Sequence, residues 1–170
     1  MATRNTTPRV EKRADGTDAV SLLIADHKEV KQLFKSYDAL VDADGGAEEK
    51  EALAEEICAM LTVHASVEEE IFYPAARESI EEQDLIDEAE VEHASAKDLI
   101  AQIQDMQPEE DLFDAKVKVL GEYIAHHVKE EEEELFPKVK RSKLDLKSLG
   151  EEMSVRKQQL MAELGAEQDA

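Results

Sequence analysis

The residues best suited to chemistry in this sequence are its histidines and the glutamates that follow two of them. Glu68 lies four positions after His64, and Glu131 lies four positions after His127. Residues four apart on a helix point the same way, one turn from each other. Imidazole nitrogens and carboxylate oxygens are common protein ligands of iron, manganese and zinc. Each pair therefore indicates one half of a metal site.

The two pairs belong to a repeated segment. Residues 64–74 and 127–137 share one plan, in which a proline lies ten positions after the histidine. A further histidine lies a similar distance upstream of each segment, so the sequence has two similar halves. A two-fold arrangement of these halves would bring both sets of side chains to the same depth. The candidate metal ligands are His27, His64, Glu68, His93, His127 and Glu131.

Apolar residues spaced three and four positions apart indicate that helices carry these side chains. One candidate histidine lies on the apolar stripe of each expected helix, and the four helices are expected within residues 17–45, 47–79, 83–107 and 108–141. Short connections between long helices imply antiparallel neighbours. The sequence therefore predicts an all-α fold, an up-down-up-down four-helix bundle over residues 17–141.

Two prolines and the chain ends refine this plan. Pro74 should kink the second helix or relax it near its end. Pro108 should stop the third helix and begin the fourth at a first-turn position. Residues 1–16 lack the apolar run of a secretory signal, and we expect a disordered tail there. Residues 142–170 should form an additional amphipathic helix and tail, which either docks on the bundle or contacts a partner protein or a second copy.

The apolar surroundings of the two glutamates strengthen the metal hypothesis. An unpaired buried charge costs several kcal/mol, and two divalent cations would compensate Glu68 and Glu131. A single histidine on an apolar stripe is more often a hydrogen-bonded core residue than a ligand. Here four of the five histidines occupy such stripes, one per helix. The fifth, His126, lies one position off the stripe, and we expect it at the surface or around the site.

Charge and cysteine content narrow the possible partners. The formal net charge is −22, and a polyanion is repelled by nucleic acids and by anionic membrane surfaces. We therefore expect no nucleic acid and no membrane as partner, and no window approaches the run of about 20 apolar residues that crosses a membrane. Cys58 is the single cysteine, which precludes an internal disulfide and suits a cytoplasmic protein.

At these motifs the sequence resembles the hemerythrin-like (HHE cation-binding) domains, over roughly residues 18–140. The resemblance implies two metal ions, one held by His27 and His64 and the other by His93 and His127, with Glu68 and Glu131 as bridges. Oxygen-carrying hemerythrins have a further histidine on the third helix, where this sequence has Lys97. Fewer protein ligands imply more positions open to water, peroxide or another small molecule.

The resulting expectation is a non-haem protein with two iron ions that binds or reacts with O2, peroxide or NO. An iron or redox sensor, or a metal-binding regulatory bundle without turnover, is the alternative. Whether the protein is an enzyme stays open, and the ligand types also suit manganese or zinc. A ferritin-like site is disfavoured, because the Glu90-x-x-His93 spacing has no second copy in the fourth helix.

Overall fold

The computed structural model describes residues 17–169, so the expected tail at 1–16 lies outside the described residues. The described chain consists of helices joined by short turns. In order, the elements are α1 (Ala19–Asp42), α2 (Ala47–Val67), the π-helical turn η1 (Glu68–Phe72), α3 (Tyr73–Ser79), α4 (Gln83–Gln104), α5 (Phe113–Glu130), the π-helical turn η2 (Glu131–Leu135), α6 (Phe136–Arg141) and α7 (Leu146–Gln168).

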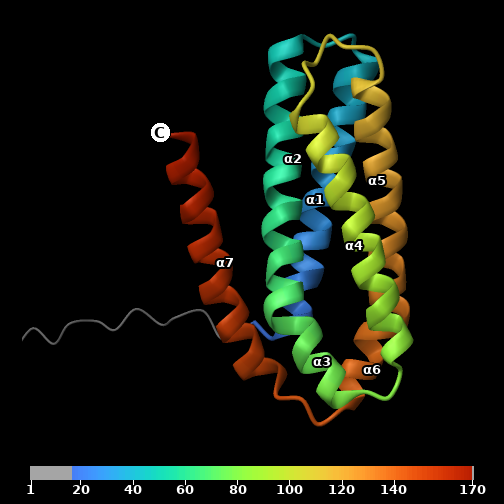
Figure 1. Ribbon diagram of the computed structural model, residues 1–170, viewed down its shortest axis with the longest axis vertical. Coiled ribbons are helices and arrows are strands. Elements are labelled where there is room, and N and C mark those ends of the chain that lie inside the picture. Colours follow the sequence, from blue (N-terminus) through green and yellow to red (C-terminus); the bar gives the residue numbers. More distant parts are fainter. Residues whose placement is uncertain (1–16, 170) are drawn as a thin grey trace, which may run out of the picture.

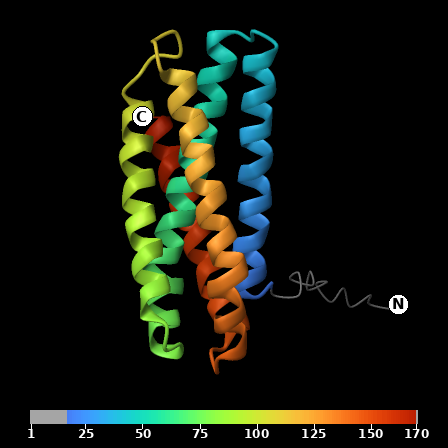
Figure 2. The same ribbon diagram turned by 90° about the vertical axis from the view of Figure 1, so that its right-hand side faces the viewer.

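Four long helical rods make up the bundle, since η1 and α3 continue α2, and η2 and α6 continue α5 (Figure 1). Helix α1 packs against α2 and α5, and α4 packs against the same two helices from the other side. Successive rods run in opposite directions, as both views show (Figures 1 and 2). The predicted up-down-up-down four-helix bundle with an additional C-terminal helix is confirmed.

The two π-helical turns each end two residues before a helical proline, Pro74 or Pro137. In each turn a backbone N–H bonds to the carbonyl five residues earlier, Tyr73 to Glu68 and Phe136 to Glu131. A proline lacks an N–H and crowds the carbonyl of the preceding turn. A wider π turn relieves that crowding, so each rod continues through its proline. The expected relaxation at Pro74 is thus a π turn that begins at a candidate ligand.

The fourth rod begins later than predicted, at Phe113 and not at Pro108. Residues 107–110 form a turn, in which the Glu110 N–H bonds to the Gln107 carbonyl. Leu112 then adopts a left-handed backbone with φ of 75°, which an α-helix cannot contain. Phe113 follows as a buried residue of the core. The chain reversal therefore uses the residues that the prediction assigned to a first helical turn.

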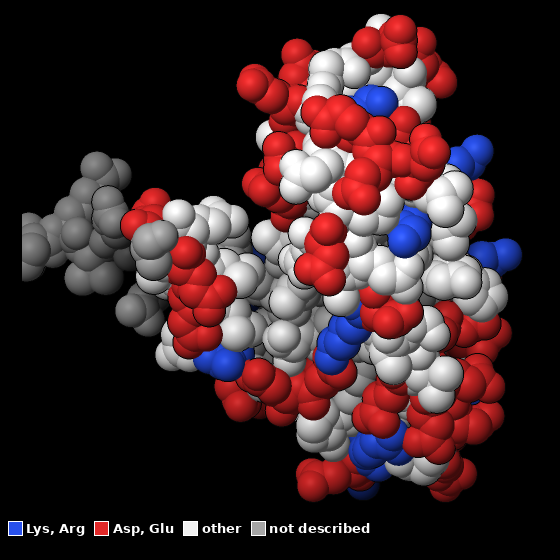
Figure 3. Space-filling view, turned by 45° about the horizontal axis from the view of Figure 1, so that its top comes forward, with Lys and Arg blue, Asp and Glu red and all other residues white. Residues whose placement is uncertain are grey.

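Two apolar clusters fill the bundle, with the candidate ligands between them. One lies at the end where α3, α6 and the start of α7 meet and includes Leu23, Phe72 and Phe136. The other lies toward the opposite end and includes Tyr37, Leu61 and Leu120. The outside is dominated by carboxylates, which cover much of the face shown in Figure 3. A polar layer is thus enclosed between two dry cores.

Helix α7 docks by its first half and leaves the bundle by its second. Leu149 and Met153 are buried in the first apolar cluster, whereas Met161 is 57% exposed. Figure 1 shows the C-terminal half of α7 diverging from α2. Docking on the bundle, one of the two options left by the sequence, thus applies to the first half. Within residues 17–169, no helix is both long and apolar enough to cross a membrane.

Candidate metal centre

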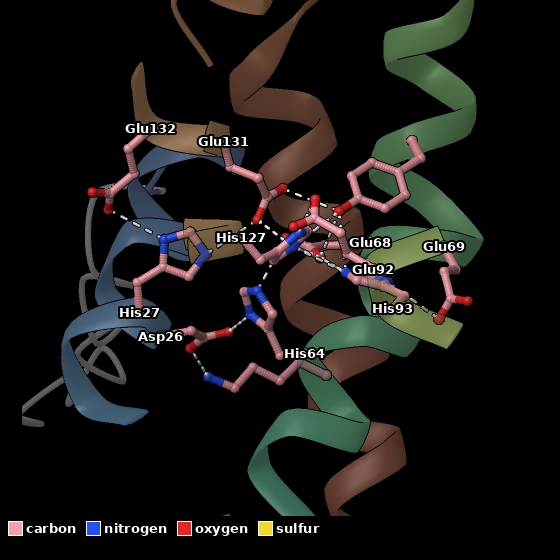
Figure 4. Close-up of polar contacts among 12 residues, drawn as sticks. Asp26, His27, His64, Glu68, Glu69, Glu92, His93, His127, Glu131 and Glu132 are labelled. Carbon is pink, nitrogen blue, oxygen red and sulfur yellow. Dashed lines mark hydrogen bonds and ion pairs between the residues drawn. The ribbon is translucent and has the colours of Figure 1, made fainter. Parts of the chain in front are cut away.

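All six candidate ligands lie together in the middle of the bundle, and all six are buried (Figure 4). They come from all four rods: α1 gives His27, α2 and η1 give His64 and Glu68, α4 gives His93, and α5 and η2 give His127 and Glu131. Their ligand atoms form two groups that can each hold an ion. One group is His27, His64, Glu68 and Glu131, and the other is Glu68, His93 and His127.

The two glutamates lie between the histidines of the two halves. Glu68 Oε1 is 3.0 Å from His64 Nε2, and its Oε2 is 2.9 Å from His93 Nε2. Glu131 Oε1 is 3.0 Å from His127 Nε2 and 3.4 Å from His27 Nε2. Each carboxylate therefore faces a histidine from its own half and one from the other half. This is the arrangement that a bridging carboxylate requires.

In each of the four candidate histidines, the other ring nitrogen, Nδ1, faces a carboxylate that is not one of the six candidate ligands. His64 Nδ1 lies 3.0 Å from Asp26 Oδ2, and His127 Nδ1 lies 3.3 Å from Glu92 Oε1. The Nδ1 atoms of the two other histidines face the residues that follow Glu131 and Glu68: His27 faces Glu132 at 3.2 Å, and His93 faces Glu69 at 3.7 Å. Asp26, Glu92 and Glu132 can accept the Nδ1 proton and leave Nε2 free to bind a metal. The 3.7 Å between Glu69 and His93 Nδ1 is too long for a hydrogen bond.

Tyr73 is a further polar group at the centre of the site, fully buried at the start of α3. Its hydroxyl lies 3.1 Å from Glu68 Oε2 and 3.1 Å from Glu131 Oε2. The hydroxyl also lies 3.2 Å from His93 Nε2. Burial, followed by the two nearby carboxylates, holds the pKa of Tyr73 well above its usual value. The phenol therefore stays protonated, and its single proton can be donated to either glutamate.

Charge inside the metal-free site is balanced by protonated histidines. Burial alone would lower the pKa of His64, but the charge of Glu68 and the hydrogen bond to Asp26 outweigh it and raise that pKa to about 10. Burial likewise opposes protonation of His127, yet Glu131 raises its pKa to about 11. Burial raises the pKa of Glu68, but the charge of His64 outweighs it and holds that pKa well below its usual range. The site is thus built for positive charge.

Several buried nitrogen and oxygen atoms of the six candidate ligands make no hydrogen bond. These atoms are His27 Nε2, His64 Nε2, His93 Nδ1, Glu68 Oε1 and Glu131 Oε1. Buried polar atoms normally have partners, and exceptions point to a functional role or to a bound ion. His64 Nε2 and Glu68 Oε1 approach to 3.0 Å, yet neither makes a hydrogen bond, and both belong to a group of ligand atoms that could hold an ion. This donor set fits a metal cation.

Comparison with known proteins agrees with this geometry. Residues 18–139 match the hemerythrin HHE cation binding domain family. The chain belongs to this family. Its family and its buried His/Glu groups together support a bound metal cation.

Two relatives show how far the likeness to this HHE domain extends. The crystal structure of a hemerythrin HHE cation binding domain-containing protein from Mycobacterium kansasii has a TM-score of 0.71, covering 86% of this chain and 89% of that one at 24% identity. That likeness establishes the fold. A protein named DNA nickase, from Nostoc sp., is 35% identical over 80 residues, 47% of this chain. The match spans 22% of that longer relative.

A cavity of about 40 Å³ adjoins the four histidines of the HHE domain on the side of the second apolar cluster. Its other lining includes Val30, Leu61, Ala96, Ile100 and Ile124. A water needs at least about 10–15 Å³ of such space, so the cavity suits a molecule of a few atoms. Its apolar wall would favour an uncharged or weakly hydrated guest.

The remaining polar residues near the HHE site lie at its edge. Lys97, where oxygen carriers have a further histidine, is half exposed and donates to Glu69 Oε1 over 2.6 Å. His126 has a side chain 65% exposed and lies 3.1 Å from Glu130. Lys97 also lines the cavity beside the four histidines. His126 Nε2 lies 3.9 Å from Glu92, and the expectation that His126 lies at the surface or around the site agrees with its position.

The sequence analysis missed Tyr73 and the four carboxylates that face the Nδ1 atoms. A signal for the carboxylates was present, because each is adjacent in the chain to a candidate ligand: Asp26, Glu69, Glu92 and Glu132. Adjacency alone does not reveal the pairing, since each carboxylate faces a histidine on another rod. Tyr73 had the weaker signal of a polar residue beside a helical proline.

Proposed function

We propose that this protein is a non-haem di-iron protein that binds or reacts with O2, peroxide or NO. In this proposal His27 and His64 hold one iron, His93 and His127 hold the other, and Glu68 and Glu131 bridge them. The observation that carries it is the position of the two buried carboxylates, each facing histidines from both halves. Bound iron would supply the redox and ligand-exchange chemistry.

The protein's own residues have three tasks in this proposal. The carboxylates at Nδ1 orient the imidazoles, and Tyr73 holds one oxygen of each bridging glutamate. The two apolar clusters exclude bulk water from the layer between them. The small cavity beside the histidines admits a ligand of diatomic or peroxide size. The absence of a histidine at position 97 leaves more coordination positions for that ligand.

The test is to load the protein with Fe(II) under anaerobic conditions and record visible spectra on adding O2, hydrogen peroxide or NO. We expect new absorption bands in the wild type and in His126→Ala, because His126 lies outside the site. His64→Ala and His127→Ala should lose the metal and, with it, the absorption bands. Loaded wild-type protein whose spectrum responds to none of the three ligands would contradict the proposal.

An iron or redox sensor without turnover is the second candidate. The observation that favours it is the contact between α7 and Asp26, which faces a candidate ligand. Turnover separates a reacting protein from a sensor: the former consumes many equivalents of peroxide or O2 per chain, whereas the latter responds once per metal site. Metal or redox state should then change the exposure of α7.

Three further features belong to this proposal. We expect no nucleic-acid partner because of the net charge of −22, although one partial relative is named a DNA nickase. Failure of the protein to retard or nick plasmid DNA, with and without metal, is the expected result. A cytoplasmic location fits the single cysteine.

The diverging half of α7 is the proposed contact for a protein partner or a second copy.

A further inference from the structure

Helix α7 lies outside the part of the chain that matches the HHE family, yet it reaches the surroundings of the candidate metal centre. The family match ends at residue 139, and α7 runs from Leu146 to Gln168. Two adjacent basic residues on α7 make ion pairs with the bundle. Arg156 contacts Glu70 at 2.6 Å, and Lys157 contacts Asp26 at 2.6 Å. Only the second pair leads toward a candidate ligand.

The contact of Lys157 continues directly to His64. Lys157 Nζ donates to Asp26 Oδ1, and the other oxygen of the same carboxylate lies 3.0 Å from His64 Nδ1. Figure 4 shows Asp26 and His64 in contact beside the cluster. His64 Nε2 in turn points at Glu68. Lys157, Asp26 and His64, from three helices, thus form a chain of contacts that ends at a candidate metal-binding nitrogen.

Asp26 depends on a cationic partner more than the other three carboxylates do. Its side chain is 7% exposed, whereas those of Glu92, Glu69 and Glu132 are 24%, 30% and 37% exposed. Water can solvate the three more exposed groups if they lose a partner. A carboxylate as buried as Asp26 needs charged or hydrogen-bonded neighbours to remain in place. Lys157 supplies the bond that His64 cannot, at the second oxygen.

We propose that Lys157 is a positioning residue of the metal centre, acting through Asp26 to hold the His64 ring with Nε2 toward the metal. Docking of α7 and metal binding at the His27/His64 position are therefore coupled, and each favours the other. This inference rests on the proposed ligand set. It gives the C-terminal helix a role in the site itself.

Loss of the Lys157 ammonium has two opposite consequences for a bound cation. Removing a positive charge near the site favours the metal by simple electrostatics. Removing the partner of Asp26 lets this carboxylate turn into the adjoining groove of about 410 Å³ between α7 and α1/α2, and His64 then loses its orienting acceptor. Arg156 offers the matched control, because it carries the same charge on the neighbouring residue of α7 but contacts Glu70.

The experiment measures Fe(II) binding by the full chain under anaerobic conditions against a competing chelator, in wild type, Lys157→Met and Arg156→Met. We expect Lys157→Met to weaken one of the two iron equivalents about tenfold relative to Arg156→Met, the lower end of the loss typical when a partner of a ligating histidine is removed. Lys157→Arg should restore most of the affinity. In an Asp26→Asn background, Lys157→Met should no longer weaken iron binding.

A second measurement follows α7 directly. Iron should slow hydrogen exchange of α7 amides in the wild type and in Arg156→Met, but not in Lys157→Met. Circular dichroism shows whether each variant is folded, and Lys157→Gln replaces Lys157→Met if the latter is not. Equal affinities in the Lys157 and Arg156 variants would overturn this inference while leaving the proposed function intact. Wild-type protein that takes up no iron would overturn both.

Discussion

Tyr73 and Phe136 occupy matching positions of the two halves, each directly before a helical proline, yet they contribute different chemistry. Phe136 stacks on His27, with ring centroids 5.8 Å apart and planes 6° from parallel. Tyr73 packs against His93 at 5.3 Å and adds a hydroxyl that contacts both bridging glutamates. The two proposed metal positions are therefore related by the repeat but have unequal surroundings.

Replacing Tyr73 by Phe tests the role of this hydroxyl. The aromatic ring fits, since Phe occupies the matching position, but the two buried glutamates lose the single O–H donor that lies between them. We expect the metal-free variant to lose about 1–3 kcal/mol of unfolding free energy, measured by urea denaturation. Tyr123→Phe is the control, because Tyr123 is 51% exposed. Equal stability of Tyr73→Phe and wild type would show that the hydroxyl is not needed by the glutamates.

The raised pKa values of His64 and His127 predict how metal binding depends on pH. With pKa values of about 10 and 11 in the metal-free protein, both imidazoles carry a proton at pH 7 that the metal must displace. Metal uptake should release about two protons per chain, and the apparent affinity should rise with pH between 6 and 9. Calorimetry in buffers of different ionisation enthalpy measures both.

The same raised pKa values make the stability of the metal-free protein fall with rising pH, opposite to the trend in metal affinity. A histidine whose pKa is raised on folding stabilises the fold fully below its unfolded value of 6.5, and this stabilisation is lost as pH rises through about 10. The metal-free form should therefore become less stable over the range in which metal binds more tightly. A metal affinity that is independent of pH, with no proton release, would contradict the assignment.

At this scale the sequence predicted which six side chains lie together, because spacing and periodicity place them on inward stripes. The sequence could not predict which carboxylate faces which histidine. Asp26 neighbours His27 in the chain but contacts His64, and that choice depends on the rotation and offset of two packed helices. The contact between Lys157 and Asp26 is harder still to predict, since Lys157 lies on a helix whose docking the sequence left open.

Among the elements, the two π-helical turns connect the repeat to the site. Each begins at a glutamate among the candidate ligands and ends just before the residue preceding a proline. A π turn adds one residue to a helical turn and so re-aims the side chains that follow it. The sequence predicted a disturbance at Pro74. It did not predict a π turn, which accommodates the proline and lets the helical rod continue.

The start of α5 could not be predicted from local sequence preferences. Pro108 is suited to a first helical turn, but the chain must first cross from α4 to the neighbouring rod. The left-handed backbone at Leu112 achieves that reversal and places Phe113 in the core. Tertiary packing therefore sets this boundary against the local preference.

The docking of α7 on the bundle depends on a close approach at Gly150. A Cβ atom there would lie 2.5 Å from the Thr17 carbonyl oxygen and 2.8 Å from the Ala19 nitrogen. Gly150→Ala should therefore loosen α7 and cost about 1–3 kcal/mol, measured by thermal or urea unfolding. Gly165→Ala on the same helix meets no neighbour within 4 Å and should stabilise by up to about 1 kcal/mol. Equal effects at both glycines would mean that α7 does not pack as described.

The whole molecule can be described as a charged layer held between two apolar clusters. Between those clusters the bundle brings one histidine from each rod to a common depth. The fold class followed from the sequence because long stripes with few breakers admit few alternatives. The identity of the metal did not, since imidazole and carboxylate ligands suit several ions.

The central claim is that six side chains bind a pair of metal ions. Its most direct test is a titration of Fe(II), without oxygen, into protein first stripped with a chelator, followed by metal analysis after desalting. We predict about two iron ions per chain in the wild type and in His126→Ala, with strong loss in His64→Ala and His127→Ala, as the bridged ligand set requires. Retention of no iron by the wild type, or equal retention by all four proteins, would contradict the account.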